Sequence, residues 1–467
     1  MQYKMLFPLF LLFFQCCWNG TAQETLDDST QTEVEALAKV FIQQTKAPGL
    51  SIAVRKGGTT IYAEGFGYAN VEAKIKMDPS ITLRTASVAK VITATALGML
   101  ATEGKLDFDT PIKKYVPYIP KMYAELTARQ LAGHTSGMKH RPRGEKFKKK
   151  QYTTIRETVL LMKAPLLFEA NTDYSYSTHA YNLLAAVIEG ASGKTYVAYM
   201  NDVVFKSLGM TNTVVEDIKA LTTKDAQLYA IKKGTLRKDK ITNASYKVPG
   251  AGFRSTPTDL VKMMDAYSNG MISTTVAAEM FKSNQLKNGT KTHVGIAWRS
   301  SIDPFDNPVI EHAGSWRGAR TVLVHYPKEG MSISIMINAD CPVLIEETAH
   351  LFAHVIRNKT RAASDLGSID EKIKLTLNSK EKKESHKGFF TLNPKIGSLK
   401  TTSTGFLKDN PVLYLGSTTN YAMATSFGLL YVQLHTDKAL NGRIFAYYNR
   451  RDTNPTTEIP LATFEKL

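Results

Sequence analysis

The sequence of 467 residues predicts a mixed α/β (α+β) fold, in which an antiparallel sheet is flanked by helices and carries a helical lobe. Three observations support this prediction. A helix and a hairpin come first, a long helical insert follows, and strands with a closing helix return near residue 320. Helices packed on an antiparallel sheet form a layered fold of this kind. After residue 363, short strand-like runs separated by turn residues predict a small all-β appendage.

The first elements are a helix and a hairpin. Residues 30–46 show helical periodicity, and Thr30 and Glu33 have the spacing of a capping box. The apolar face of this helix consists of Val34, Leu37, Ala38 and Phe41. Residues 51–55 and 59–65 then alternate around Gly57-Gly58, which predicts a hairpin.

The next helix is expected to be buried. Residues 87–103 carry apolar side chains on almost every side, and Gly104 is expected to end the helix. A helix that is apolar all round belongs inside a core. The chain then stays mainly helical to about residue 267. The later elements are strands at residues 321–326 and 331–338 and a closing helix at residues 345–358.

The N-terminus has the pattern of a secretory signal peptide, so we expect export to the periplasm or beyond the cell. Lys4 precedes an apolar run from Met5 to Phe14, and Gly20-Thr21-Ala22 forms a small-residue cleavage site. Cleavage after Ala22 would remove residues 1–22. The run is about half the ~20 residues that a membrane span needs. Lipidation of Cys16 or Cys17 remains an alternative.

The formal net charge is +17, and the basic residues gather at residues 140–150, 231–240 and 380–387. Solvated loops are the favoured interpretation, and binding of anionic envelope polymers is the other one. Export argues against nucleic acid as a partner. Without Cys16 and Cys17, only Cys341 remains, so no intrachain disulfide is expected. The oligomeric state stays open.

Ser87-Val88-Ala89-Lys90 is the central motif. A serine and a lysine three residues apart at the start of a helix share one face. A serine hydroxyl becomes a good nucleophile when a neighbour accepts its proton, and a lysine can do this when burial lowers its pKa. The helix N-terminus adds partial positive charge and backbone N–H groups for an oxyanion. Alone, such a motif is weak.

Two further motifs strengthen it. Tyr176-Ser177-Thr178 and His312-Ala313-Gly314-Ser315 follow the first motif in this order. Together they resemble the SxxK, Tyr-Ser-Asn and Lys-Thr-Gly or His-x-Gly motifs of the class C β-lactamase and penicillin-binding family. Shorter family-like phrases lie between them at residues 104–111, 131–138, 190–193, 250–260 and 295–298. The likeness covers roughly residues 30–358, and it is strongest to the serine β-lactamase-like proteins known from mitochondria.

The resemblance implies a β-lactamase/transpeptidase-like fold with a hydrolase domain at residues 23–363. The change in composition, and not the resemblance, predicts the small β-rich domain at residues 364–467. The resemblance also implies roles for single residues. Ser87 would be acylated, Lys90 would accept its proton, and Tyr176 would relay a proton to the leaving group. His312 would polarise Tyr176 or bind a substrate carboxylate. The backbone N–H groups of Ser87 and Ser315 would form the oxyanion hole.

The substrate-binding residues implied by the resemblance are Thr178, Ala313 and Gly314, and Arg320 is a further candidate on chemical grounds. Thr178 departs from the family pattern, because it stands where β-lactamases have an asparagine. This substitution puts efficient β-lactam turnover in doubt. Arg317 and Arg320 stand where small or apolar residues are usual, and a guanidinium there could grip a carboxylate. A pair of solvated arginines is the alternative.

The leading hypothesis is therefore a serine hydrolase that needs no cofactor or metal and acts on a peptide, ester or β-lactam-like carbonyl. D-amino-acid peptidase or esterase activity is favoured over efficient β-lactamase activity. The alternative is an exported, non-catalytic binding or assembly protein. His350 and His354 share a helix face, but the glutamate of the HExxH zinc motif is absent. His134, in a glycine-rich turn, is expected to fix a loop by hydrogen bonds.

Overall fold

A computed structural model describes residues 25–140, 150–232, 235–303, 307–341 and 343–357, and the strands that follow residue 368. The predicted signal segment at residues 1–22, with Cys16 and Cys17, and most of the basic run at residues 140–150 lie outside the described residues. Within the described part, no helix combines the length and the apolar character that a bilayer span requires.

The centre of the protein is a seven-stranded antiparallel sheet with the order β3-β2-β1-β12-β11-β10-β9. Its strands are β1 (Gly49–Lys56), β2 (Thr59–Asn70), β3 (Ile75–Lys76), β9 (Arg299–Ile302), β10 (Pro308–Trp316), β11 (Ala319–Tyr326) and β12 (Met331–Ile337). The hairpin β1–β2 turns at Gly57 and Gly58, whose φ angles of 54° and 78° are left-handed and favour glycine. The predicted hairpin is confirmed.

Two helices from opposite ends of the chain cover one face of this sheet. They are α1 (Asp28–Thr45) and α10 (Ile345–Arg357), and their apolar side chains share a core with Ile52, Val54 and Ile335. The capping-box prediction for α1 is wrong. The N-cap is Asp27, whose carboxylate accepts a hydrogen bond from the Thr30 backbone N–H at 2.9 Å. Asp is a better N-cap residue than Thr, and here the helix begins three residues earlier.

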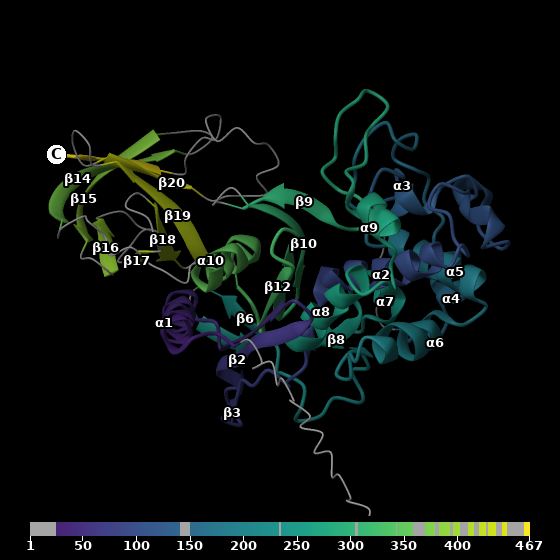
Figure 1. Cartoon of the computed structure of the whole chain (residues 1–467), viewed down its shortest axis with the longest axis horizontal. Helices are drawn as coiled ribbons and strands as arrows, with labels where there is room; N and C mark the ends of the chain where they lie inside the picture. The colour runs from purple at the N-terminus through teal and green to yellow at the C-terminus, as the bar shows by residue number, and fades with distance from the viewer. Residues whose placement is uncertain are drawn as a thin grey trace, which may run out of the picture.

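The other face of the sheet carries the helical lobe (Figure 1). Its helices are α2 (Ala89–Thr102), α3 (Ala128–Ala132), α4 (Ile155–Leu160), α5 (Ala180–Ser192), α6 (Tyr196–Tyr199), α7 (Val248–Ala251), α8 (Pro257–Met263) and α9 (Thr274–Phe281). Helix α2 is buried along its length from Ala89 to Leu100, as predicted. It ends just before Gly104, whose φ is 69°. The fold class expected from the sequence is confirmed.

Two small sheets connect the lobe to the central sheet. One has the order β4-β8-β5 and the other β13-β6-β7. Their strands are β4 (Leu83–Arg84), β5 (Val214–Val215), β8 (Phe253–Ser255), β6 (Tyr229–Lys232), β7 (Thr235–Lys238) and β13 (Ala339–Asp340). Strand β4 ends three residues before Ser87, so the first of these sheets sets the position of the nucleophile motif.

Beyond residue 368 the described strands form a closed barrel, in which each strand pairs with other barrel strands. They are β14 (Ile369–Asn378), β15 (Lys383–Leu392), β16 (Ile396–Thr401), β17 (Asn410–Tyr414), β18 (Asn420–Thr425), β19 (Gly428–His435), β20 (Asn441–Phe445) and β21 (Ala462–Lys466). The barrel lies beside α1 and α10 (Figure 1). The domain boundary at residue 363 stays a prediction, because residues 358–368 are not described.

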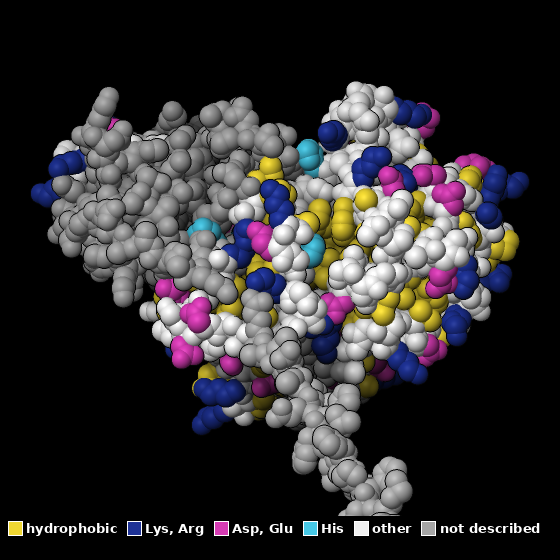
Figure 2. Space-filling view, in the orientation of Figure 1, with side chains coloured by type: hydrophobic (Ala, Val, Ile, Leu, Met, Phe, Trp, Pro, Cys, Tyr) yellow, Lys and Arg dark blue, Asp and Glu magenta, His cyan; other side chains and the backbone are white. Residues whose placement is uncertain are grey.

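The charged side chains on the described surface are mixed in sign. Figure 2 shows Lys and Arg spread among Asp and Glu on the face in view, with no single basic field. Several of the lysines and arginines are ion-paired, among them Lys113 with Glu125 and Arg129 with Asp109. Interspersed charges of both signs are typical of an ordinary solvated surface.

Candidate active site

Ser87 lies in a strained turn directly before α2. The turn is a short 3-10 helix, Ala86–Val88, and Ala86 adopts a left-handed φ of 46°. A non-glycine residue in that region costs on the order of 1–3 kcal/mol, and such strain clusters at functional sites. Ala86 and Val88 are buried, whereas Ser87 is partly exposed. The turn therefore presents the Ser87 hydroxyl at the N-terminal end of a 14-residue helix.

Lys90 is completely buried beside Ser87. Its Nζ lies 3.3 Å from Ser87 Oγ, 3.2 Å from Thr178 Oγ1 and 2.9 Å from the Gly250 carbonyl oxygen. Burial, and secondly the charge of Arg299, lower the pKa of Lys90 well below its usual value. A neutral amine can donate to Gly250 and Thr178 and direct its lone pair at the Ser87 hydroxyl. This is the arrangement that a proton acceptor for Ser87 requires.

Gly250 is a part of this arrangement that the sequence interpretation left without a role. A Cβ at position 250 would lie 2.7 Å from Thr178 Cγ2 and 2.8 Å from the Thr178 carbonyl oxygen. The absence of a side chain thus lets α7 approach Thr178 closely enough for both residues to bind Lys90. The sequence hint to Gly250 was the family-like phrase at residues 250–260, which marks the residue as part of the family pattern but does not show that it contacts Lys90.

Tyr176 is held beside Ser87 by His134. The Ser175 N–H donates to the His134 carbonyl oxygen at 2.9 Å, and the Ser177 N–H donates to His134 Nδ1 at 3.2 Å. The rings of His134 and Tyr176 lie 4.3 Å apart. His134 therefore fixes the backbone on both sides of Tyr176. This observation agrees with the structural role expected for His134.

Both members of this pair are expected to be neutral. Burial raises the pKa of Tyr176, and a hydrogen bond with Ser87 and the charge of Arg299 oppose that rise. Burial, then Lys90 and Arg299, lower the pKa of His134 well below its usual value. Tyr176 is thus a phenol with a proton to give. It also lies within reach of Lys90, whose Nζ is 4.8 Å from the ring centroid.

Strand β10 passes against the Ser87 turn. A Cβ at Gly314 would lie 2.5 Å from the Thr85 carbonyl oxygen and 2.9 Å from the Ser87 backbone nitrogen, so only glycine fits there. Ala313 and Ser315 flank this contact, and Ser315 is exposed. Ser87 and Ser315 line the same cavity.

His312, the first residue of the third motif, is buried and does not line the cavity. Its Nδ1 lies 2.8 Å from the Ala313 carbonyl oxygen. Burial, then Arg299 and Lys90, lower the pKa of His312 well below its usual value. The imidazole is therefore neutral at neutral pH. This geometry gives no support to the alternative in which His312 binds a substrate carboxylate.

These residues meet at a cavity of about 420 Å³. Of the residues predicted from the sequence, its wall contains Ser87, Tyr176, Thr178, Ala313, Gly314, Ser315 and Arg320. Residues that the sequence interpretation missed also line it: His140, His179, Tyr246, Lys247, Arg299, Trp316 and Glu346. The site thus combines the three motifs with a mixed wall of aromatic and charged side chains.

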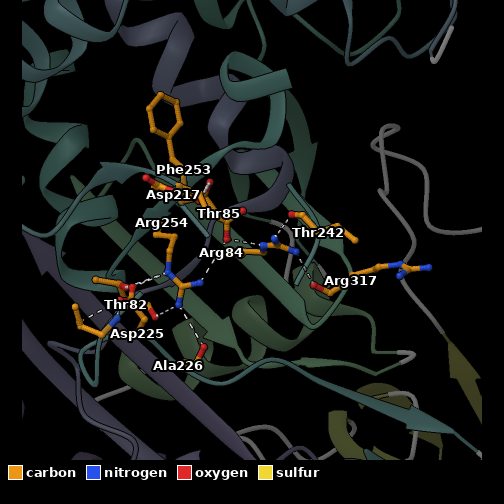
Figure 3. A network of polar contacts seen from close by, with 12 residues as sticks. Thr82, Arg84, Thr85, Asp217, Asp225, Ala226, Thr242, Phe253, Arg254 and Arg317 are labelled. Atoms are coloured by element: carbon orange, nitrogen blue, oxygen red, sulfur yellow. Dashed lines mark hydrogen bonds and ion pairs between the residues drawn. The ribbon is translucent and has the colours of Figure 1, made fainter. Parts of the chain in front are cut away.

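The two arginines after the third motif, Arg317 and Arg320, differ in where their side chains lie relative to the cavity. Arg320 lines the cavity, and its Nη2 lies 2.5 Å from Asp340 Oδ1 in an ion pair. Arg317 is exposed, and Figure 3 shows its side chain directed away from the polar network. Only Arg320 is therefore placed to contact a substrate.

A buried ionic network supports the strand that leads to Ser87 (Figure 3). Arg84 Nε lies 2.7 Å from Glu216 Oε1, and Arg84 Nη2 donates to the Thr242 carbonyl oxygen at 2.6 Å. Arg254 lies on the neighbouring strand β8, 3.4 Å from the same carboxylate oxygen and 2.7 Å from Asp225. Removing one partner of such a buried set leaves an uncompensated charge, so the network fixes β4 firmly.

Arg299 and Glu346 form an ion pair at the cavity wall, with Arg299 Nη1 3.1 Å from Glu346 Oε1. Arg299 directly follows the family-like phrase at residues 295–298, and Glu346 lies in the first turn of α10. Nothing in either local pattern indicates that the two side chains meet. Among the described residues, His, Cys, Asp and Glu form no group of three placed to hold a metal ion.

Sequence comparison finds relatives of two kinds. The chain is 29% identical over 295 residues to the human serine β-lactamase-like protein LACTB, mitochondrial, which covers 48% of this chain and 54% of that protein. It therefore spans about half the length of that relative. It is also 23% identical over 352 residues to Protein flp of Staphylococcus aureus, covering 72% of this chain and 68% of that protein.

Three solved structures have a similar fold. The octameric penicillin-binding protein homologue of Pyrococcus abyssi matches with a TM-score of 0.62 and 19% identity, over 93% of this chain and all of that one. D-amino acid amidase of Ochrobactrum anthropi, complexed with D-phenylalanine, matches with a TM-score of 0.61 and 21% identity, over 71% of this chain and 100% of that one. The β-lactamase/D-alanine carboxypeptidase of Pseudomonas syringae reaches 0.59 with 18% identity, over 72% and 100%.

A model of the β-lactamase family matches residues 34–353. The match spans the central sheet, the helical lobe and all three motifs, and it stops short of the barrel. Together with the buried Lys90 beside Ser87, it shows that the chain belongs to the β-lactamase family.

Proposed function

We propose that this protein is a serine hydrolase that works through an acyl-enzyme on Ser87. The observation that carries the proposal is the buried Lys90, whose Nζ lies 3.3 Å from Ser87 Oγ with its pKa held low. A lysine whose pKa is lowered accepts a proton from a neighbouring hydroxyl more readily at a given pH than a free, protonated lysine can. A purely structural lysine has no need of a serine hydroxyl beside it or of a cavity on the other side of that serine.

Acylation would begin with transfer of the Ser87 proton to Lys90. Ser87 Oγ then bonds to the substrate carbonyl carbon, and the carbonyl oxygen becomes an oxyanion at the N–H groups of Ser87 and Ser315. Tyr176 donates its proton to the leaving amine or alcohol as the scissile bond breaks. Lys90 returns the proton to Tyr176. The proton lost by Ser87 thus leaves with the first product, and the charges balance.

Deacylation would reverse these roles. A water molecule replaces the departed group, and Tyr176 with Lys90 accepts its proton as the water oxygen attacks the ester carbonyl. The tetrahedral intermediate collapses and the bond from the acyl carbon to Ser87 Oγ breaks. Ser87 regains its proton, and the acid product leaves. Apart from this water and the substrate, the steps use only side chains and backbone groups of the protein.

For the substrate we favour a small peptide, amide or ester over a β-lactam. Thr178 already accepts a hydrogen bond from Lys90, so its short hydroxyl has less capacity for a substrate amide. The neutral His312 offers no cation for a carboxylate. We further propose export, on the strength of the predicted signal peptide at residues 1–22.

Intact-mass analysis after treatment with a fluorophosphonate, and separately with a penicillin, tests the proposal. We expect one adduct, located on the peptide that contains Ser87, and none in Ser87→Ala. Ser300→Ala is the matched control, because Ser300 lies on β9 and donates to the Phe281 carbonyl oxygen away from Lys90. Labelling that persists in Ser87→Ala would contradict the assignment. A wild-type protein that stays unlabelled would favour a non-catalytic binding protein.

A further inference from the structure

Arg299 occupies a position that the three motifs do not account for. It is the first residue of β9, at the edge of the central sheet, and it pairs in register with Glu311 on β10, the neighbour of His312. Its guanidinium lines the same cavity wall as Ser87 and Tyr176, and its side chain is 20% exposed. The position of β9 at the edge of the sheet and its register with β10 thus bring the permanently charged Arg299 to the cavity that Ser87 and Tyr176 line.

The guanidinium is held by one carboxylate. Glu346, in the first turn of α10, accepts from Arg299 Nη1 at 3.1 Å, and its own side chain is only 13% exposed. In the described part of the chain this is the single hydrogen bond that Arg299 makes through its guanidinium. An arginine has five N–H donors, so the remaining donors leave the charge only partly satisfied beside the cavity.

The other cations of the cavity wall are directed elsewhere. Arg320 is ion-paired with Asp340, and Lys247 Nζ lies 3.6 Å above the Trp316 ring. Neither charge contributes to the lowered pKa of Lys90, whereas Arg299 does, after burial. The charge of Arg299 also acts on Tyr176 and His312. Within the described residues, Arg299 is therefore the permanent cation with the widest influence on the site.

We propose that Arg299, held in place by Glu346, is a positioning residue whose fixed positive charge keeps Lys90 in its proton-accepting form and stabilises charge that develops on Tyr176. The inference rests on the proposed acyl-enzyme mechanism and adds a residue to it. A fixed cation is effective here because the site is buried, where charges interact more strongly than in water. It compensates for the neutral imidazole of His312 on the adjacent strand.

The groups that face Lys90 come from several elements. Ser87 lies on the turn before α2, Tyr176 precedes α5, Tyr181 lies on α5 with its ring 5.2 Å from Nζ, and His134 follows α3. His312 lies on β10, Arg299 on β9 and Glu346 on α10. Tyr176 and Tyr181 have raised pKa values, and the two histidines have lowered ones, each through burial first. Arg299 is the member of this set whose charge lowers the pKa of Lys90 after burial. Two carboxylates act on Arg299: burial raises the pKa of Glu346, and His350 lowers that of Glu311 in spite of burial.

The test is the pH dependence of fluorophosphonate acylation of the full chain, followed by intact mass. The acylation rate should rise with pH as Lys90 loses its proton, and we call this rise the acid limb of the profile. Loss of the Arg299 charge stabilises protonated Lys90, so in Arg299→Gln the acid limb should move to higher pH. At a fixed pH on that limb, acylation should be about tenfold slower, and the rates should converge at high pH. Arg299→Lys keeps the charge and should keep the profile. Glu346→Gln removes the opposing charge and should move the limb to lower pH.

Arg55→Gln is the matched control, because Arg55 is equally buried in an ion pair with Asp265 but lies away from the cavity. The inference would be overturned by a folded Arg299→Gln protein whose acylation rate is unchanged, or is lowered by the same factor at every pH so that the profile does not shift. If Arg299→Gln does not fold, Glu346→Gln decides: a limb that stays in place overturns the inference. In all these outcomes Ser87 is labelled. A wild-type protein without a Ser87 adduct would instead refute the proposed function.

Discussion

Lys90 Nζ donates to the Gly250 carbonyl oxygen at 2.9 Å and lies 3.3 Å from Ser87 Oγ. The contact with Gly250 fixes the amine between α2 and α7 and leaves its lone pair for the Ser87 hydroxyl. Since burial and Arg299 lower the pKa of Lys90, the charged form is disfavoured in the resting site. The packing of α2 against α7 buries Lys90 and lowers its pKa, and the neutral amine in turn makes Ser87 reactive.

The first prediction concerns this amine. Activity should rise with pH through an apparent pKa well below the ~10.4 of a free lysine, because only neutral Lys90 accepts the Ser87 proton. Lys90→Arg stays charged and should lose nearly all acylation. Rates of fluorophosphonate labelling from pH 5 to pH 10 give the profile. A Lys90→Arg protein that keeps most of its activity would mean that Ser87 has another base.

The second prediction concerns Gly250→Ala. The added Cβ would press on backbone and side-chain atoms of Thr178 at less than 3 Å, so Thr178 and Lys90 must shift. Misplacement of about 1 Å should slow acylation about tenfold to a hundredfold in a folded protein. Gly98→Ala is the control, because its Cβ would meet flexible atoms of Met280 and Ile272 in the core of α2. Equal acylation rates in both variants would refute the positioning role of Gly250.

How far could this site be predicted from the sequence? The residues of the three motifs were found because each motif is a short local pattern, and the structure brings Ser87, Tyr176 and Gly314 to one cavity. Arg299 and Glu346 were missed because they lie 47 positions apart and meet only through the β9–β10 register and the packing of α10. Their encounter is a property of tertiary structure.

The same distinction applies to the fold. The hairpin at Gly57-Gly58 and the buried α2 follow from turn chemistry and hydrophobic periodicity, and both were predicted. The start of α1 was misplaced because Thr30 and Glu33 have capping-box spacing, whereas Asp27, which is a better N-cap residue than Thr, caps the helix. The strand-like runs after residue 363 were visible, but closure of the barrel depends on pairing of β14 with β21, about 90 residues later in the chain.

The third prediction concerns stability on the far side of the sheet, where His350 Nε2 lies 2.8 Å from Glu311 Oε2. Burial opposes protonation of His350, but Glu311 outweighs it and raises the pKa of His350 from 6.5 to about 9. A raised folded-state pKa stabilises the protein fully below pH 6.5, and this contribution is lost as pH rises through about 9. The shift corresponds to on the order of 3 kcal/mol.

Urea unfolding at pH 6 and pH 9 measures this contribution. The free energy of unfolding should fall over this interval in the wild-type protein and fall less in the double variant Glu311→Gln/His350→Gln, which keeps a hydrogen-bonding pair without charge. The single variants are avoided because each leaves one buried charge unpaired. Lys39→Gln, which removes an exposed ion pair with Glu35, is the control. Identical pH dependence in the wild-type protein and the double variant would contradict the prediction.

The fourth prediction is that residues 23–363 fold and react without the barrel. Among the described strands, those of the barrel pair with one another and none of them joins the central sheet. The truncated protein should be soluble and should still be labelled at Ser87, with lower thermal stability because α1 and α10 lose their contacts with β18 and β19. A truncation that is soluble but cannot be acylated would show that the barrel shapes the site, through α10 and Glu346.

The last prediction concerns substrate choice. In the class C β-lactamases, an asparagine amide and a lysine ammonium stand at the positions of Thr178 and His312. Here Thr178 is a hydroxyl that already contacts Lys90, and burial keeps His312 neutral by lowering its pKa. Arg299 and Arg320 also line the cavity, and each shares its charge with a carboxylate, Glu346 and Asp340 respectively. A β-lactam therefore meets fewer groups able to hold its amide and carboxylate.

Losing one hydrogen bond to a charged group costs ~1.5–3 kcal/mol, which corresponds to about a tenfold to hundredfold loss in rate. We therefore expect small esters and D-amino-acid peptides to be turned over faster than penicillins, which should acylate Ser87 slowly. Steady-state kinetics on p-nitrophenyl acetate, a D-alanine peptide and nitrocefin decide the order, with Ser87→Ala as the background for each. If nitrocefin has much the highest kcat/KM, the substitutions at Thr178 and His312 do not weaken β-lactam binding, and the protein is a β-lactamase in activity as well as in fold.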